Sequence, residues 1–379
     1  MRVLHVTPAF WPATYWGGPI ITTYYLCNAL ASLQGVELRV LTTDAAGLRL
    51  SEQVKVKDFP VRYSAGYEVY FTRRIAGRGI APGLLVRLRD MVRWADVVHL
   101  QYTYSFPTIP TLAACRLLNK PVVWSPHGAL QAAHEWEAAS KPILKKMWER
   151  VCTAVMPKRC VLHAASEAEK AASLARLPRV TTAVIPHGVD GPVDLPLRVW
   201  LPKRALRVMY IGRLDPMKGI ENLLRALSLL DKSIAVLDIY GSGDCTYAAS
   251  LAELGRSLGL NGRMQFHGHV EGEAKQRAFL EANVCVIPSH SENFGMVVAE
   301  ALVHGVPVIA SRATPWAEVE VMGCGLWVDN SPRELAKAIM WMRESDLEAM
   351  GGRGRRWMEV AFSWDAVAGR MNDLYRSVV

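Results

Sequence analysis

The sequence predicts an α/β protein with two doubly wound, Rossmann-like parallel sheets. Short runs rich in Val, Ile and Leu alternate along the chain with segments of helical periodicity. These runs are apolar at successive positions, as in parallel strands that are covered on both faces. With 379 residues the chain is too long for one ordinary core, so we expect two domains of roughly 150–200 residues each.

The predicted elements follow one another in a regular order. In the first half we expect strands over 2–6, 36–43, 96–100 and 121–125, and helices over 19–33 and 108–118. In the second half we expect strands over 207–212, 234–241, 284–289 and 307–311. Three prolines and a glycine interrupt the periodicity between residues 191 and 203. This boundary predicts an N-terminal domain over 1–195 and a C-terminal domain over 203–363, which face each other across a cleft where ligands bind.

The last segment of the chain, residues 364–379, predicts a separate amphipathic helix. Its apolar residues recur at helical spacing, at Val367, Met371, Leu374 and Val378.

Composition fits a globular protein of the cytoplasm. The chain is 51% hydrophobic and 21% charged, close to average usage. Its seven cysteines are scattered and form no CxxC pair, which argues against a disulfide framework and against a zinc site. The first residues lack a cleavage-site pattern, and the most apolar long window, 294–310, contains Glu300 and Pro307. We therefore expect no signal peptide and no transmembrane helix.

Positive charge is concentrated in the first half. Residues 1–200 hold 24 Lys and Arg against 14 Asp and Glu, a net charge of +10, which leaves 20 against 21 for the rest of the chain. This asymmetry predicts a polyanionic partner for the N-terminal half, either a membrane surface or a nucleic acid.

The stretch SHSENFGMVVAEALVHGVPVIAS carries two carboxylates, Glu292 and Glu300, beside an apolar run. A helix is expected to start between Phe294 and Met296, so that its free N–H groups form an anion site that Gly295 lets a phosphate approach. Glu300, inside the helix, could then accept hydrogen bonds from the two hydroxyls of a ribose. The alternative is an ordinary acid at the helix start and a solvated Glu300.

The segment RVMYIGRLDPMKGIENLLRAL places Arg213 and Lys218 between a strand and a helix. Two cations at such a crossing suit a diphosphate, because charge-assisted hydrogen bonds are strong. The alternative is two surface cations. The motif YGSGD puts Gly241 in a further strand-end turn, and FHGHV, with His267, is a loop that could present backbone groups to the edge of a base.

In the first half, TYWGGPI places Gly17 and Gly18 in the loop after the first strand, where bare backbone could meet phosphates. A simple turn explains these glycines equally well. WSPHGAL places His127 directly after the strand at 121–125, at a carboxyl edge, although a lone histidine is more often structural. His187 in IPHGVD follows the last strand of this half, and we assign no chemistry to it.

Taken in order, the motifs WGGP, PHG, GRLDPMKG, YGSGD and ENFGMVVAE resemble the retaining nucleotide-sugar glycosyltransferases of family 4 (glycosyltransferase group 1), which have the GT-B fold. The resemblance covers nearly the whole chain, and the flanking loops look like the bacterial branch that assembles exopolysaccharide or lipopolysaccharide. Two departures stand out. ATPWAEV occupies the place of a loop that is often glycine-rich, and His187 stands where Asn is usual.

The resemblance implies roles for the candidate residues. Glu300 would hold the ribose, Arg213 and Lys218 the diphosphate, and Gly17 and Gly18 would form the loop on the phosphate side. His127 and Glu292 would lie beside the transferred sugar, and the helix over 364–379 would cross back onto the N-terminal domain. The remaining donor-site candidates are Gly241, His267, Phe294, Gly295 and Met296.

The expected reaction is hexosyl transfer from a nucleoside diphosphate sugar to an acceptor hydroxyl with retention of configuration. We expect no cofactor and no metal, because the protein's own cations face the leaving diphosphate and the sequence has no DxD pair. Two alternatives stay open. One is a nucleotide-sugar epimerase or a phosphorylase of the same fold, and the other is a non-enzymatic polyanion-binding protein, although no nucleic-acid-binding module is recognisable.

A basic amphipathic helix within 141–159 predicts peripheral binding to the inner face of the cell membrane and a lipid-linked saccharide as acceptor. Its cations are Lys141, Lys145, Lys146, Arg150, Lys158 and Arg159, and its apolar residues are Ile143, Leu144, Met147, Trp148 and Val151. A second basic cluster is expected from Arg73, Arg74, Arg78, Arg87, Arg89 and Arg93. The alternative is a solvated charged face.

Overall fold

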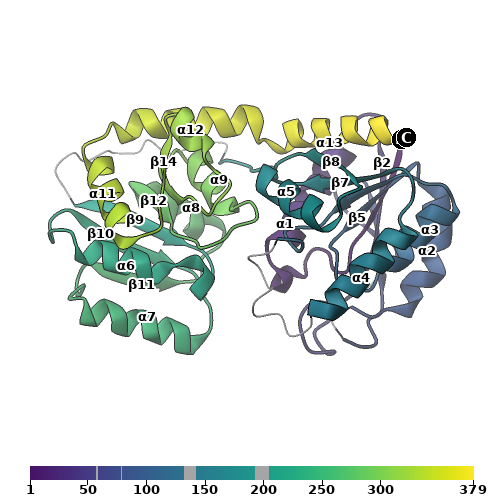
Figure 1. Ribbon diagram of the computed structural model, residues 1–379, viewed down its shortest axis with the longest axis horizontal. Helices are drawn as coiled ribbons and strands as arrows, with labels where there is room; N and C mark the ends of the chain where they lie inside the picture. Colours follow the sequence, from purple (N-terminus) through teal and green to yellow (C-terminus); the bar gives the residue numbers. More distant parts are fainter. Residues whose placement is uncertain (57–58, 78, 132–141, 193–204) are drawn as a thin grey trace. The chain divides into compact units, whose positions relative to one another are not determined.

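A computed structural model describes residues 1–56, 59–77, 79–131, 142–192 and 205–379 of the chain. The chain divides into two compact units, which we call unit 1 (Met1–Gly188 and Trp364–Val379) and unit 2 (Val189–Ser363). Each unit contains one sheet with helices on both of its faces (Figure 1). The predicted α/β class with two parallel sheets is thus confirmed. Most of the predicted boundary segment, 193–204, lies outside the described residues.

Unit 1 is built on an eight-stranded sheet of order β3-β4-β2-β1-β5-β6-β7-β8, in which only β3 is antiparallel to its neighbour. Its strands are β1 (Arg2–Val6), β2 (Glu37–Thr43), β3 (Val61–Arg62), β4 (Glu68–Thr72), β5 (Val97–Gln101), β6 (Val122–Ser125), β7 (Cys160–Ala164) and β8 (Thr181–Val184). Its helices are η1 (Thr14–Trp16), α1 (Gly18–Ala31), α2 (Pro82–Trp94), α3 (Thr108–Leu117), α4 (Pro142–Val155), α5 (Glu167–Arg176) and α13 (Trp364–Val378).

Successive residues of the unit 1 strands enter two different cores, because side chains alternate between the faces of a sheet. Val98 packs into a core with α2, α3 and α4, whereas its neighbour Val97 packs with α1 and α13. Both faces are therefore buried, which explains the continuous apolar runs. On α13, Val367 and Met371 are buried and Tyr375 is fully enclosed.

Unit 2 is built on a six-stranded, fully parallel sheet of order β11-β10-β9-β12-β13-β14. Its strands are β9 (Leu206–Ile211), β10 (Ala235–Tyr240), β11 (Met264–Gly268), β12 (Val284–Ile287), β13 (Val308–Ser311) and β14 (Gly325–Val328). Its helices are η3 (Pro216–Lys218), α6 (Ile220–Ser228), α7 (Cys245–Ser257), α8 (Gly272–Glu281), α9 (Met296–Val303), α10 (Glu318–Val321), α11 (Pro332–Arg343) and α12 (Leu347–Ala361).

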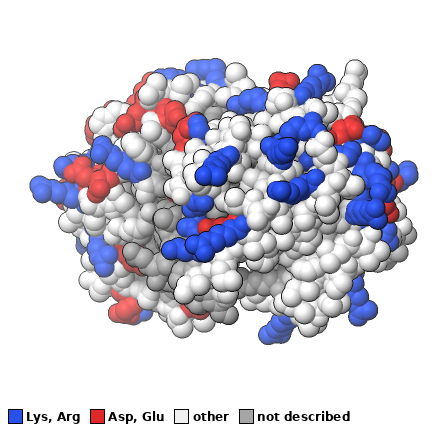
Figure 2. Space-filling view, turned by 45° about the vertical axis from the view of Figure 1, so that its right-hand side comes forward, with Lys and Arg blue, Asp and Glu red and all other residues white. Residues whose placement is uncertain are grey.

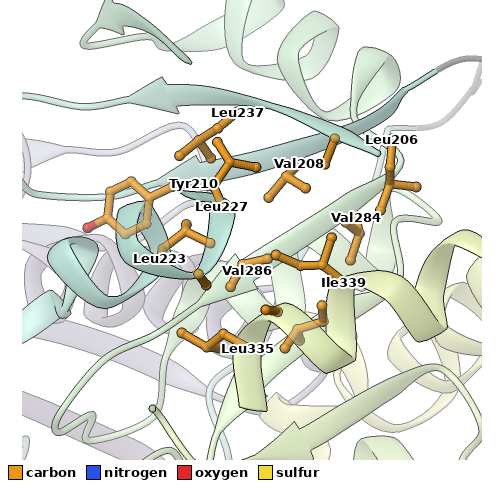
Figure 3. Packing of buried hydrophobic residues seen from close by; sticks show 14 of the residues in the cluster. Leu206, Val208, Tyr210, Leu223, Leu227, Leu237, Val284, Val286, Leu335 and Ile339 are labelled. Atoms are coloured by element: carbon orange, nitrogen blue, oxygen red, sulfur yellow. The ribbon is translucent and has the colours of Figure 1, made fainter. Parts of the chain in front are cut away.

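A hydrophobic core of unit 2 joins strands β9, β10 and β12 to helices α6 and α11. Figure 3 shows Val208, Leu237 and Val286 of the strands pointing toward Leu223 of α6 and Ile339 of α11. The strands are therefore held by packing against α6 and α11.

Both sheets contain a point where the strand order reverses. In unit 2, β9 lies between β10 and β12, and the strand order reverses between β9 and β12. In unit 1 the corresponding neighbours are β1 and β5. Ligands of open α/β sheets bind at such reversal points, and the candidate residues after β9 and β12 lie at this position in unit 2.

Three sequence predictions were wrong in detail. FHGHV was expected to be a loop, but residues up to Gly268 belong to strand β11 because they pair with β10. Arg74 was placed in a surface cluster, but it is 1% exposed and its guanidinium donates to the carbonyls of Gly47, Arg49 and Glu52. Trp148 was placed on an outer apolar face, but its indole N–H donates to the Thr103 carbonyl at 2.9 Å.

No helix among the described residues is both long enough and apolar enough to span a bilayer.

Candidate functional site

The loops after β9 and β12 are joined at the carboxyl edge of the unit 2 sheet. The His290 N–H donates to the Met217 carbonyl at 2.8 Å. Gly219 has a left-handed φ of 63°, and a Cβ at this residue would lie 2.1 Å from the Pro288 carbonyl oxygen. Only glycine permits this close approach. Gly219 therefore lets the backbone next to Lys218 pack against the loop after β12.

This contact brings Lys218 and Glu292 together. The Lys218 Nζ lies 2.6 Å from Glu292 Oε1, and the Ser289 hydroxyl donates to the same oxygen at 2.9 Å. The two side chains are only 20% and 14% exposed. A partly buried pair of this kind holds both groups in a defined position, more firmly than a surface ion pair would.

Arg213 lies in the same loop as Lys218 and is exposed to solvent. The loop is held by the Tyr210 hydroxyl, which donates to the Arg213 carbonyl at 2.7 Å. Among the described residues, no acceptor is bonded to the Arg213 guanidinium, which is therefore available to an anionic ligand.

Helix α9 begins beside these cations. It starts at Met296, within the predicted range, and is preceded by Gly295 with φ 80°. No side chain caps this end, so its first amide groups are open to an anion. The Phe294 side chain is buried among aromatic rings and the Trp316 indole N–H donates to the Phe294 carbonyl, so the Phe294 side chain is not available to a ligand.

Glu300 lies on α9 and is not simply solvated. Its Oε1 is 2.7 Å from the Lys275 Nζ of α8, and its side chain is 25% exposed. The pair orients the carboxylate. No residue in the described part of the chain is bonded to Oε2, which can accept from another donor.

The loop after β10 pairs with the loop after β9. The Gly212 N–H donates to the Tyr240 carbonyl and the Leu214 N–H to the Ser242 carbonyl, at 3.0 and 2.9 Å. A Cβ on Gly241 would lie 1.8 Å from the Gly212 carbonyl oxygen. Gly241 therefore has a backbone role, which is to let the two strand ends come together.

His267 lies on the edge strand β11, next to β10. Its Nε2 is 2.7 Å from Asp238 Oδ1, and its ring stacks on Tyr240 with centroids 4.4 Å apart. The structure thus gives this side chain a partner on β10.

In unit 1, Gly17 and Gly18 form the start of α1. Gly17 has φ 84°, which favours glycine, and a Cβ on either residue would meet no atom within 4 Å. The space above this turn is open, and Trp16 anchors the loop through a hydrogen bond to the Ala45 carbonyl at 3.0 Å.

His127 follows β6 in a strained turn. Its φ is 54°, which is rare for a residue other than glycine and is common at functional positions. Its Nε2 lies 2.5 Å from Gln101 Oε1, and its ring stacks on His187 at 5.9 Å. Burial, together with the neighbouring His187, lowers the pKa of His127 well below its usual value, so the ring is neutral. The turn is held by the buried Glu169, which accepts from the Gly128 N–H at 2.5 Å.

The candidates therefore form two groups, one in each unit. Unit 2 brings together Arg213, Lys218, Glu292 and the start of α9, with Gly241 supporting the loops and Glu300 further along the helix. Unit 1 carries Gly17, Gly18 and His127. Sequence reasoning missed Lys275 and Gln101, which lie on other elements and belong to no motif recognised in the sequence. Trp316 lies in the ATPWAEV segment, for which the sequence predicted no contact. The described residues contain no group of three or more His, Cys, Asp or Glu side chains that could hold a metal ion.

The sequence is similar to those of known glycosyltransferases. Residues 16–191 match the family described as Glycosyltransferase Family 4, and residues 200–357 match the family described as Glycosyl transferases group 1. A D-inositol 3-phosphate glycosyltransferase of Streptomyces griseus is 31% identical over 195 residues, which are 48% of this chain and 41% of that protein. The chain spans a little under half the length of the first curated relatives that it matches.

Solved structures share the fold over the full length. Sucrose-phosphate synthase from Thermosynechococcus elongatus superposes with a TM-score of 0.73 at 23% identity, over 100% of this chain and 98% of that one. HepE of Anabaena, in complex with UDP, superposes with a TM-score of 0.74 at 19% identity, over 100% of both chains. Since two consecutive family matches account for nearly the whole sequence and the fold agrees throughout, the chain belongs to the group 1 and family 4 glycosyltransferases and has the GT-B fold.

Proposed function

We propose that the protein transfers a hexosyl group from a nucleoside diphosphate sugar to an acceptor hydroxyl, with retention of anomeric configuration. The observation that carries the proposal is the grouping of Arg213, Lys218 and the open start of α9 at the strand reversal of the unit 2 sheet. Three sources of positive potential at one sheet edge suit a diphosphate. HepE has the same fold and was solved in complex with UDP, a nucleoside diphosphate, which supports a ligand of this kind.

The chemistry follows from where charge develops. The bond between the anomeric carbon and the β-phosphate oxygen breaks, and negative charge grows on the departing diphosphate. Arg213, Lys218 and the α9 amides would bind that charge most tightly in the transition state, which lowers the barrier. Because the protein supplies these charges itself, we propose that transfer needs no metal ion.

The acceptor hydroxyl would attack from the face of the leaving group. Its oxygen forms the new bond to the anomeric carbon, and its proton passes to an oxygen of the departing phosphate. Glu292 and His127 would lie beside the sugar, where the carboxylate and the neutral imidazole can accept hydrogen bonds from its hydroxyls. Glu300, oriented by Lys275, would accept from the ribose.

The donor can be identified by a thermal-shift panel of UDP, GDP, ADP and their sugars. A ligand present at about 100 times its dissociation constant stabilises by ~2.7 kcal/mol, which gives a clear rise in the unfolding temperature. The product formed from the donor and an acceptor is then analysed by NMR for its anomeric configuration, with and without EDTA. A product that retains the anomeric configuration and still forms in the presence of EDTA supports the proposal. A product of inverted configuration, or no rise in the unfolding temperature with any nucleotide, would reject it. Epimerised free nucleotide sugar, or cleavage that depends on phosphate, would instead assign an epimerase or a phosphorylase.

We also propose that the acceptor is a saccharide linked to a lipid at an anionic membrane surface on the inner face of the cell membrane. Helix α4 exposes Ile143, Leu144, Met147 and Val151, and these residues are between 43% and 74% exposed. Lys146 and Arg150 are exposed on the same helix. Apolar residues interleaved with cations suit the boundary between headgroups and acyl chains.

The second basic cluster is smaller than expected. Arg74 is buried and Arg78 lies outside the described residues, while Arg87 stacks on the Phe59 ring at 4.2 Å and Arg93 pairs with Asp90 at 3.6 Å. On the face seen in Figure 2, Lys and Arg side chains form separate groups with uncharged surface between them. The membrane proposal therefore depends on α4.

Flotation with anionic liposomes tests the membrane proposal. The wild-type protein should float at low salt, and a variant with Ile143→Ser and Met147→Ser should stay at the bottom. Leu117→Ser is the matched control, because Leu117 is 85% exposed on another helix of the same unit. Wild-type protein that fails to float, or equal flotation of all three proteins, would reject the assignment of α4. Efficient transfer to a soluble acceptor such as an inositol phosphate, with no transfer to a lipid-linked one, would reject the proposed acceptor.

A further inference from the structure

A chain of buried hydrogen bonds connects His127 to the C-terminal helix α13. It lies entirely within unit 1 and joins residues from four strands of the sheet and from α13. Its members, in order, are His127, Gln101, His5, Tyr375, His99, Ser125, His163 and the carbonyl of Ile185. No motif of the sequence predicts this chain.

The far end of the chain fixes the direction of its hydrogen bonds. The Ile185 carbonyl can only accept, so His163 Nε2, at 2.8 Å, carries a proton and donates it. A neutral His163 then has an unprotonated Nδ1, which must accept from the Ser125 hydroxyl at 2.7 Å. The Ser125 oxygen in turn accepts from His99 Nε2 at 2.6 Å. Each step leaves only one tautomer for the next imidazole.

The direction of the hydrogen bonds is fixed in the same way from Tyr375 to His127. His99 Nδ1 has no proton, so the Tyr375 hydroxyl donates to it at 2.6 Å. Having used its only proton, Tyr375 can only accept from His5 Nε2, at 3.3 Å. His5 Nδ1 must then accept from the amide nitrogen of Gln101, also at 3.3 Å. This turns the Gln101 oxygen toward His127 Nε2, which must carry the proton.

The imidazole rings of this hydrogen-bond chain are neutral because they are buried. His5, His99 and His163 are each at most 5% exposed. Burial lowers the pKa of His5 to about 3 and that of His163 to about 4, and it also lowers the pKa of His99. At neutral pH all of these imidazoles are uncharged, so a single donor-to-acceptor direction runs through the chain.

We infer that Tyr375 is a positioning residue, which holds His127 in the tautomer protonated at Nε2 and leaves Nδ1 as a hydrogen-bond acceptor for a substrate hydroxyl. No described residue is bonded to that Nδ1. The part of the inference that concerns the substrate rests on the proposed function, in which His127 lies beside the transferred sugar. The tautomer itself depends only on the chain of hydrogen bonds.

The test is the ¹⁵N spectrum of the full-length protein with labelled histidine, recorded without substrate at pH 7.5. The His127 resonances are assigned with His127→Ala. In the wild type, Nε2 should have the shift of a protonated ring nitrogen and Nδ1 that of an unprotonated one. A His127 that is protonated at Nδ1, or that averages between the two tautomers, would overturn the inference.

Two variants test the role of the chain. In Tyr375→Phe the ring stays but the hydroxyl is lost, so His5 and Gln101 can reverse their hydrogen bonds and the two His127 shifts should move toward each other. Ser125→Ala cuts the chain on the other side of His99, should have the same effect, and serves if Tyr375→Phe does not fold. Tyr67→Phe is the control, since Tyr67 is buried in the same unit and bonds to Asn28 at 2.9 Å. If His127 keeps its single tautomer in a folded Tyr375→Phe protein, Tyr375 does not position it.

Activity separates this inference from the proposed function. In Tyr375→Phe, turnover should fall while the dissociation constant of the nucleoside diphosphate, which is bound by unit 2, stays the same. If the wild type has the predicted tautomer but transfers no sugar, the proposed function fails and the tautomer assignment stands. If the enzyme transfers sugar with His127 protonated at Nδ1, the inference fails and the proposed function stands.

Discussion

Replacing Glu292 with glutamine is expected to tighten the binding of a nucleoside diphosphate and to slow sugar transfer. In the structure the Glu292 carboxylate forms an ion pair with the Lys218 ammonium, with Oε1 and Nζ 2.6 Å apart. If Lys218 binds the diphosphate, that carboxylate lies close to a second anion. A glutamine side chain keeps the shape of the glutamate and removes its charge.

The size of the effect follows from the distances. A phosphate oxygen hydrogen-bonded to Lys218 Nζ at ~2.8 Å would lie within ~5.4 Å of Glu292 Oε1. Two unit charges at that separation repel by ~3 kcal/mol at an effective dielectric constant of about 20. Since both side chains retain some exposure to solvent, we expect a net gain of ~1–2 kcal/mol, or roughly 5–30-fold tighter binding. Transfer should nevertheless fall, because Glu292 would no longer accept a hydrogen bond as an anion.

Isothermal titration with the nucleoside diphosphate measures this directly. Thermal shift alone is unsuitable, because Glu292→Gln also leaves the partly buried ammonium without its ion pair and should lower stability by ~1–3 kcal/mol. Glu253→Gln is the control, since it removes the same charge from an exposed ion pair of α7 in the same unit. Binding that weakens in Glu292→Gln, or that tightens equally in the control, would refute the placement of Lys218 at the phosphates.

The remaining predictions concern charge, backbone and pH. Arg213→Ala should slow transfer by ~10²–10³-fold with an unchanged unfolding temperature, whereas Arg225→Ala, an exposed cation of α6, should behave as wild type; transfer by the Arg213 variant within a few-fold of wild type would contradict its role. Gly241→Ala should cost ~2–4 kcal/mol, because its Cβ would lie 1.8 Å from a backbone oxygen, and an unchanged urea midpoint would argue against that close approach. Burial lowers the pKa of His5 to about 3 and that of His163 to about 4, against ~6.5 in the unfolded chain. The unfolded state therefore binds more protons, so the stability present above pH ~6.5 declines as the pH falls, by ~4 kcal/mol for the two residues at pH 5. Urea unfolding at pH 7.5 and pH 5 measures this loss, and equal midpoints would disprove it.

Local features of the fold were predictable because they depend on neighbours in the sequence. Apolar runs indicated strands buried on both faces, and each of the eight strands expected from such a run is observed within a few residues of its expected bounds. The start of α9 at Met296 and its end before Gly305, which has a left-handed φ of 68°, follow from local helix-end chemistry. Misassignments arose where a local pattern was outweighed by a partner elsewhere, as in β11, where pairing with β10 extends the strand through a predicted loop.

The candidate site was predictable as a set of residues but not as a set of contacts. Arg213, Lys218 and Glu292 could be named from their positions after strands. That Lys218 bonds to Glu292, 74 residues away, depends on β9 and β12 being neighbours, which periodicity does not encode. The same holds for the pair of Glu300 with Lys275.

The sequence alone determined the strands that have continuous apolar runs and the loops that carry cations and glycines, because backbone propensity and side-chain period act over a few residues. Tertiary structure alone decided which charges meet, that Arg74 is buried, and that Tyr375 reaches His5 across 370 residues. The physical reason is that hydrogen bonds and ion pairs form between groups within about 3 Å of each other, and strand order, not sequence distance, brings those groups together.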